Sequence, residues 1–140
     1  MVGIILLGHN KFGSGLKSSM ELIVGEQDYV SAIDFLPEYG TEILDKRISE
    51  ELVKLENCSE IIIFTDLMGG SPFNRAMTAF ISSHKNNIHV ISGSNLPMVI
   101  EAVMSRDGNK DIQSFISNIM NTGKDGIKYE IGRASCRERV

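Results

Sequence analysis

The 140-residue sequence predicts an α/β fold: a doubly wound, mainly parallel sheet with helices on both faces. Short apolar runs of strand length alternate with longer segments in which apolar residues recur every three or four positions. Several of the short runs are apolar without interruption, as in strands that helices cover on both sides. No linker-like stretch and no internal repeat divides the chain, so we expect one domain.

The first half of the chain contains two strand–helix units. Residues 2–7 form an unbroken apolar run, which predicts a buried strand. Residues 12–24 carry apolar side chains at helical spacing, and Gly25 is a typical end for such a helix. Residues 29–35 predict a second strand. Thr41 is then expected to cap a helix whose buried stripe continues to about residue 55.

The second half repeats the alternation. Residues 60–65 include the run IIIF, which predicts a third buried strand. Ser71 and Pro72 predict the start of a helix to about residue 83, because Ser is a favoured N-cap and Pro suits the first helical position. The remaining predicted elements are a strand at 88–92, helices at 96–105 and 111–121, and a short edge strand at 127–131.

Composition excludes several classes of protein. The net charge is −4 with scattered basic residues, which argues against a nucleic-acid-binding surface. No run approaches the roughly 18 apolar residues of a membrane span, and no signal-peptide pattern opens the chain, so we expect a cytoplasmic protein. Cys58 and Cys136 lie far apart without metal-ligand spacing, and we expect neither a disulfide nor a metal site. Residues 130–140 contain three arginines and no packing period, so we interpret them as a non-native tail after a domain at 1–129.

Two polar side chains follow predicted strands at positions that suit a functional site. His9 ends the first apolar run, and Asp66 directly follows the third. In open parallel sheets, sites form outside the carboxyl ends of the strands, near the point where the strand order reverses. We therefore expect both side chains at the same edge of the sheet.

The segment after Asp66 has the features of an anion-binding loop. Gly69 and Gly70 allow backbone conformations and close approaches that other residues resist. Ser71 follows at the start of a helix, where the first N–H groups lack partners within the helix and the helix dipole is positive. This combination predicts a phosphoryl-binding loop formed by Gly69, Gly70 and Ser71.

The pair of His9 and Asp66 indicates phosphoryl transfer. A carboxylate that accepts a hydrogen bond from one ring nitrogen fixes the histidine tautomer and leaves the other nitrogen with a free lone pair. Such a nitrogen beside an anion-binding loop is what a phosphoryl acceptor requires. If the donor is another phosphohistidine, the bond made resembles the bond broken, so positioning and charge stabilisation supply most of the catalysis. No cofactor and no metal ion need be invoked.

Each feature also has a simpler structural interpretation. His9 can be a polar residue entering a loop, Asp66 can bind nearby backbone N–H groups, and the glycine pair can make a tight turn. The combination is more specific than its parts. We interpret the other two histidines, His84 and His89, as surface or helix-end residues.

The sequence resembles a known family at these residues. The matching segments are the apolar strand that ends in Gly8-His9, LIVGEQDYV, DLMGGSPFNRA at 66–76 and SGSNLPMVIEAVMSRD at 92–107. In these segments the chain is similar to enzyme IIA domains of the mannose class of the bacterial sugar phosphotransferase system. The resemblance covers residues 1–129, and DLxGGSPFN is its most specific part.

The resemblance implies a cytoplasmic homodimer in which a C-terminal strand is exchanged between subunits. It further implies that His9 is phosphorylated by the phosphocarrier protein HPr and that Asp66 orients it. The phosphoryl group then passes to a histidine of a IIB component, and the membrane components IIC and IID carry the sugar. Residues 130–140, where they replace native sequence, would truncate the exchanged strand after Tyr129 and weaken the dimer.

The rim around His9 supplies the expected partner-binding residues. Leu67, Met68 and Leu96 are apolar residues that HPr and IIB can contact in turn, although Leu96 is also a candidate for the core. Asn10 stands where many family members have glycine, and it adds a side chain beside the nucleophile.

Two other functions remain open from the sequence. One is the phosphotransfer subunit of a dihydroxyacetone kinase, against which the GGSPFN segment argues. The other is a regulatory module that binds a partner in one phosphorylation state only. A nucleotide- or flavin-binding domain is disfavoured, because neither GxGxxG nor a Walker loop follows the first strand.

Overall fold

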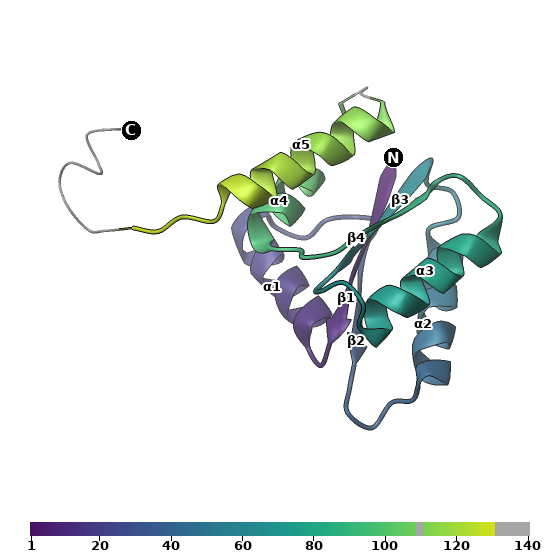
Figure 1. Ribbon diagram of the computed structural model, residues 1–140. Helices are drawn as coiled ribbons and strands as arrows, with labels where there is room; N and C mark the ends of the chain where they lie inside the picture. The colour runs from purple at the N-terminus through teal and green to yellow at the C-terminus, as the bar shows by residue number, and fades with distance from the viewer. Residues whose placement is uncertain (109–110, 131–140) are drawn as a thin grey trace.

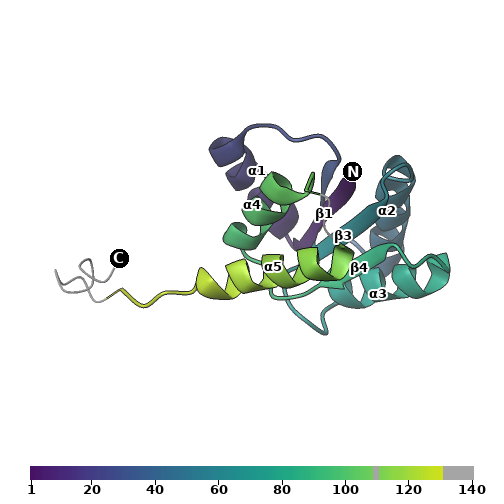
Figure 2. The ribbon, with the colours of Figure 1, turned by 90° about the horizontal axis from the view of Figure 1, so that it is seen from above.

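A computed structural model of the chain describes residues 1–108 and 111–130, in which a parallel four-stranded sheet lies between two layers of helices (Figures 1 and 2). The strands are β1 (Val2–His9), β2 (Val30–Phe35), β3 (Glu60–Thr65) and β4 (Ile88–Ile91), in the spatial order β2-β1-β3-β4. The helices are α1 (Phe12–Val24), α2 (Thr41–Lys54), α3 (Ser71–Ser83), α4 (Leu96–Ser105) and α5 (Ile112–Asp125). The predicted α/β fold with a doubly wound parallel sheet is confirmed.

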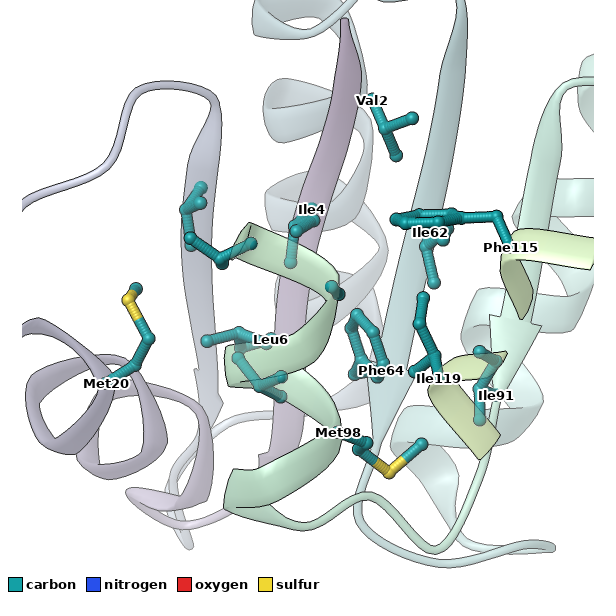
Figure 3. Packing of buried hydrophobic residues seen from close by; sticks show 14 residues of the cluster. Val2, Ile4, Leu6, Met20, Ile62, Phe64, Ile91, Met98, Phe115 and Ile119 are labelled. Carbon is teal, nitrogen blue, oxygen red and sulfur yellow. The ribbon is translucent and has the colours of Figure 1, made fainter. Parts of the chain in front are cut away.

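The helices divide between the two faces of the sheet. Helices α1, α4 and α5 cover one face, and α2 and α3 cover the other (Figure 2). Each face buries its own hydrophobic cluster. Figure 3 shows the cluster under α1, α4 and α5, whose labelled members are Val2, Ile4, Leu6, Met20, Ile62, Phe64, Ile91, Met98, Phe115 and Ile119.

Strand β1 lies inside the sheet, between β2 and β3, and contributes to both clusters. Ile4 and Leu6 point into one cluster, while Ile5 and Leu7 point into the other, and all four are fully buried. Successive strand residues face opposite sides of the sheet, so a strand covered on both faces must be apolar at every position. This requirement explains the uninterrupted apolar run at the start of the chain.

The strand order reverses at β1. The chain passes from β1 to β2 on one side and then returns to form β3 on the other side of β1. Leu7 of β1 pairs with Thr65 of β3, so the carboxyl ends of these two strands lie side by side. The residues that follow, including His9 and Asp66, meet at this switch point.

Several predicted element ends are wrong by one to a few residues. Gly40 and Gly70 are the N-caps of α2 and α3, so Thr41 and Ser71 are the first helical residues, and neither cap makes a side-chain hydrogen bond. Helix α5 continues to Asp125, beyond the predicted end at residue 121. Gly123 does not end this helix, and a Cβ there would lie 3.1 Å from Met98 Sδ, so the glycine is a packing position.

The C-terminal segment leaves the body of the protein after α5. Residues 127–130 extend away from the helices (Figures 1 and 2) and pair with no strand among the described residues. The predicted strand at 127–131 therefore does not form within the single chain over 127–130, and its last residue lies outside the described residues. Cys136 and most of the predicted non-native tail also lie outside them. No helix in 1–108 or 111–130 is long and apolar enough to cross a membrane.

Helix α1 approaches the sheet closely at one glycine. A Cβ on Gly13 would meet the carbonyl oxygen of Leu6 and would lie 2.6 Å from that of Ile33, so a side chain there forces the helix away from β1 and β2. Gly15 lies in the same helix, and a Cβ there would meet nothing within 4 Å. A glycine-to-alanine substitution therefore adds a methyl group to a crowded site at Gly13 and to an open site at Gly15.

We expect Gly13→Ala to lower the free energy of unfolding by about 2 kcal/mol or more, because the added methyl overlaps two rigid backbone carbonyls. Gly15→Ala is expected to raise it by roughly 0.5–1 kcal/mol, because alanine costs less backbone entropy than glycine inside a helix. Urea denaturation of both variants measures the difference. Equal effects of the two substitutions would contradict the close packing of α1 on the sheet.

Candidate functional site

His9 and Asp66 are joined by two hydrogen bonds at the carboxyl edge of the sheet. His9 is the last residue of β1, and its Nδ1 lies 2.7 Å from Asp66 Oδ2. The main-chain N–H of His9 donates to the same oxygen at 2.8 Å. The carboxylate thus holds both the backbone and the ring of the histidine.

This contact assigns the tautomer of His9. An ionised carboxylate only accepts hydrogen bonds, so the short Nδ1···Oδ2 contact places the ring proton on Nδ1. Nε2 then carries the free lone pair. About 46% of the His9 side chain is exposed against 13% for Asp66, so the carboxylate is covered and the imidazole is accessible.

Asp66 is held as an anion by surrounding N–H groups. Burial by itself raises the pKa of this carboxyl group. The hydrogen bonds from His9 and from the main-chain N–H of Leu67, which donates to Oδ1 at 2.8 Å, outweigh the burial. The pKa of Asp66 therefore lies below its ordinary value of 3.8, and the group is ionised at neutral pH.

The glycine loop packs directly against the imidazole. A Cβ on Gly70 would lie 2.7 Å from His9 Cε1 and 3.1 Å from Nε2, so only glycine permits this approach. Gly69 has a φ of +87°, in the left-handed region that favours glycine. The side-chain amide of Asn74 donates to the Gly69 carbonyl at 3.1 Å and so ties the loop to the first turns of α3. The loop is therefore shaped around the ring edge that carries Nε2.

The start of α3 adds unpaired donors to this loop. Gly70 is the N-cap and has extended backbone angles, and α3 begins at Ser71 without a side-chain cap. Within residues 1–108 and 111–130, no group accepts a hydrogen bond from the main-chain N–H of Gly69 or Ser71. Free N–H groups at the positive end of a helix dipole attract an anion. The structure thus brings His9, Asp66 and the predicted phosphoryl-binding residues together.

A further residue contacts His9 from the other side of β1. Phe35, the last residue of β2, places its ring edge-on to the imidazole, with centroids 6.2 Å apart and planes at 67°. Its carbonyl oxygen accepts the Asn10 N–H at 2.7 Å. No local sequence pattern indicates a role for Phe35, because it becomes a neighbour of His9 only through strand pairing.

The predicted rim residues differ in exposure. Leu67 and Met68 are exposed, at 51% and 71%, and Asn10 is exposed with a φ of +51°. Leu96 is half-buried against the core cluster under α4, so a role in partner binding stays a prediction for this residue.

The other two histidines lie away from the site. His84 is the left-handed C-cap of α3, as expected for a helix-end residue. The surface interpretation of His89 is wrong: it lies inside β4, its side chain is mostly buried, and its Nε2 is 3.5 Å from Glu60 Oε1. The described part of the chain holds no group of three or more His, Cys, Asp or Glu side chains arranged for a metal ion.

The lowered pKa of Asp66 predicts a pH-dependent contribution to stability. The ionised carboxylate stabilises the folded state above the unfolded pKa near 3.8, and this contribution is lost as the pH falls through the lower folded pKa. Asp66→Asn cannot ionise, so the stability advantage of the wild type over this variant is expected to shrink as the pH falls below about 4. Urea denaturation of both proteins between about pH 5 and pH 2.5 measures it. An advantage that stays constant over this range would contradict the assignment.

The chain is similar to known components of the phosphotransferase system. Residues 3–120 match the family described as the PTS (phosphotransferase system) system fructose IIA component. The chain is 32% identical over 127 residues to the mannose-specific EIIAB component of Escherichia coli (strain K12), which is 91% of this chain and 39% of that protein. It is 31% identical over 117 residues to the sorbose-specific EIIA component of Lacticaseibacillus casei, covering 84% of this chain and 82% of that protein.

A solved structure shares the fold. The crystal structure of phosphotransferase system component EIIA from Streptococcus agalactiae superposes with a TM-score of 0.84 at 32% identity, covering 92% of this chain and 97% of that one. The chain spans less than half the length of the EIIAB relative but most of the length of the sorbose EIIA relative. Fold, family match and sequence identity agree, and the chain belongs to the mannose-type EIIA family of the sugar phosphotransferase system.

Proposed function

We propose that this chain is a cytoplasmic phosphoryl carrier that accepts a phosphoryl group from phospho-HPr on His9 and passes it to a IIB component. The sugar would then be taken up and phosphorylated through the membrane components IIC and IID. The observation that carries the proposal is the placement of His9. Its Nδ1 is bound to Asp66, while its Nε2 edge lies against Gly70, next to free N–H groups.

The geometry supports Nε2 as the reacting atom. Its lone pair attacks the phosphorus of the donor phosphohistidine, a new N–P bond forms, and the electron pair of the broken N–P bond returns to the donor ring. Positive charge develops on the His9 ring during this step, and the Asp66 carboxylate on Nδ1 stabilises it. The N–H groups of Gly69 and Ser71 are available to the phosphoryl oxygens. Delivery to IIB is the same step in reverse, with the IIB histidine as acceptor.

Partner docking is proposed for the exposed rim. Leu67 and Met68 project from the loop that follows Asp66, and Asn10 lies beside the nucleophile. Flexible apolar side chains adapt to more than one partner, which suits a carrier that must bind a donor and an acceptor at the same histidine.

A homodimer is proposed at the β4 edge. β4 is an outer strand of the sheet, and a groove of about 580 Å³ runs along it between α3 and α5. Its lining includes Met77 and Met120, and most of that lining is apolar. Residues 127–130 extend from the body with Ile127 and Tyr129 exposed, and an extended segment of this kind can add a strand to a free edge in a second copy.

Labelling of His9 tests the carrier function. After incubation with phosphoenolpyruvate, enzyme I and HPr, the wild type is expected to carry acid-labile phosphate, and His9→Ala is expected to carry none. His84→Asn is the matched control, since it removes a histidine at the end of α3 and keeps a residue suited to the left-handed cap. Full labelling of the His9→Ala protein would refute the site.

Asp66→Asn is expected to stay folded and to accept the phosphoryl group on the order of 100-fold more slowly, because the ring loses its fixed tautomer and orientation. Stopped-flow or quench-flow transfer from phospho-HPr measures the rate.

Offering the phosphorylated protein either a IIB component or a dihydroxyacetone kinase subunit separates the two pathways. Transfer to the kinase subunit and not to the IIB component would show that the chain belongs to the dihydroxyacetone kinase pathway.

The dimer is tested by a charge placed in the groove. Met120→Arg is expected to shift the wild-type dimer to monomer in analytical ultracentrifugation, because the arginine would face the apolar groove. Met104→Arg is the control, since Met104 is an exposed methionine on α4 outside that groove. A monomeric wild type, or a dimer unaffected by Met120→Arg, would count against the β4 interface.

A further inference from the structure

We propose that Phe35 is a positioning residue for phosphoryl transfer: its aromatic ring and its carbonyl hold His9 in the orientation that presents Nε2. This inference rests on the proposed function of His9. Phe35 does not touch the transferred group in the proposal, and it acts only through the histidine.

The first observation is the ring contact. Phe35 pairs with His9 in the β1–β2 register, so its side chain starts from the neighbouring strand at the same level. The two rings meet edge to face at a centroid distance of 6.2 Å. Contacts of this geometry are favourable beyond the area that they bury, and they restrict the tilt of both rings.

The second observation is that the end of β2 also binds the backbone that follows the histidine. The Phe35 carbonyl accepts the N–H of Asn10 at 2.7 Å, where the chain turns with a left-handed φ. The Asp34 carboxylate accepts the Ser14 N–H at 2.9 Å and the Ser14 hydroxyl at 2.6 Å, in the first turn of α1. The segment that follows His9 is therefore bound to the end of β2 at Asn10, before α1 begins, and at Ser14, in the first turn of α1.

The third observation is that the hydrogen bond to Asp66 leaves the orientation of the His9 ring only partly determined. Asp66 binds the ring through one contact, from Nδ1 to Oδ2, and a single hydrogen bond does not by itself fix the plane of the ring. Gly70 limits that motion from the loop after β3. Phe35 limits it from β2, the strand on the other side of β1. The imidazole therefore lies between Gly70, which follows β3, and Phe35, which ends β2. Removal of the Phe35 ring leaves the imidazole without a contact on the β2 side.

Phe35 also packs against the core cluster under α2 and α3, so a purely structural role is the competing explanation. Phe35→Leu keeps an apolar side chain and the backbone carbonyl but removes the aromatic ring. Phe35→Tyr keeps the ring and serves as the conservative rescue. Phe115→Leu is the matched control, because it makes the same substitution in the buried cluster on the opposite face of the sheet.

The experiment measures two properties of each full-length variant. The first is the steady-state rate of transfer from phospho-HPr, separated into kcat and KM. The second is the order of the His9 imidazole, from NMR relaxation of its ring C–H groups in the absence of any partner. Phe35→Leu is expected to lower kcat about 3- to 10-fold at nearly constant KM, as for the loss of one aromatic contact, and to lower the ring order. Phe35→Tyr should restore both, and Phe115→Leu should lower stability alone.

Each outcome has a distinct meaning. Wild-type kcat and ring order in Phe35→Leu would overturn the positioning role, and so would an equal loss of kcat in Phe115→Leu. Absence of labelling in the wild type itself would instead refute the proposed carrier function, while the NMR comparison would still decide whether Phe35 orders His9.

Discussion

The contact between His9 and Asp66 is the interaction on which the site depends, and the topology of the sheet makes it possible. The two residues are 57 positions apart in sequence. They meet because β1 and β3 are adjacent, parallel and paired in a register that places both chain exits at one edge. A shift of this register by one residue would turn every apolar side chain of β3 to the other face. The packing of the two core clusters therefore also fixes the distance between imidazole and carboxylate.

Charge is distributed unevenly within a small volume of the site. Asp66 is an anion with three N–H donors: the backbone and ring of His9 and the backbone of Leu67. A few residues further on, the N–H groups at the start of α3 have no acceptor within the described residues. The first set of donors binds the Asp66 carboxylate, and the N–H groups at the start of α3 are open to a second anion. The imidazole lies between them, bound to the first and in contact with the loop that carries the second.

Much of this arrangement could be predicted from the sequence. The unbroken apolar runs identified β1 and β3, and the polar residues after them indicated the edge where a site would form. Residue types alone predict the loop at 69–71, although they favour Ser71 as the N-cap. Gly70 takes that position, and it has no Cβ that would overlap the imidazole, a contact that no local pattern indicates.

What could not be predicted depends on contacts between distant segments. Phe35 reads as one more apolar strand residue until the β1–β2 register places it beside His9. His89 follows an exposed turn in the sequence, yet strand alternation turns its side chain toward Glu60. Gly123 is a residue type that often ends helices, and here it lets α5 pass close to Met98. In each case tertiary packing decides between interpretations that are equal at the local level.

The exposure of His9 has a consequence for how a phosphorylated form would behave. Nearly half of the imidazole surface faces solvent, while its carboxylate partner is covered. A high-energy N–P bond at Nε2 would therefore be open to hydrolysis whenever the protein is alone in solution. A docked partner that covers the ring would shield this bond from water, so the closeness of the fit between the two proteins would decide between transfer and hydrolysis.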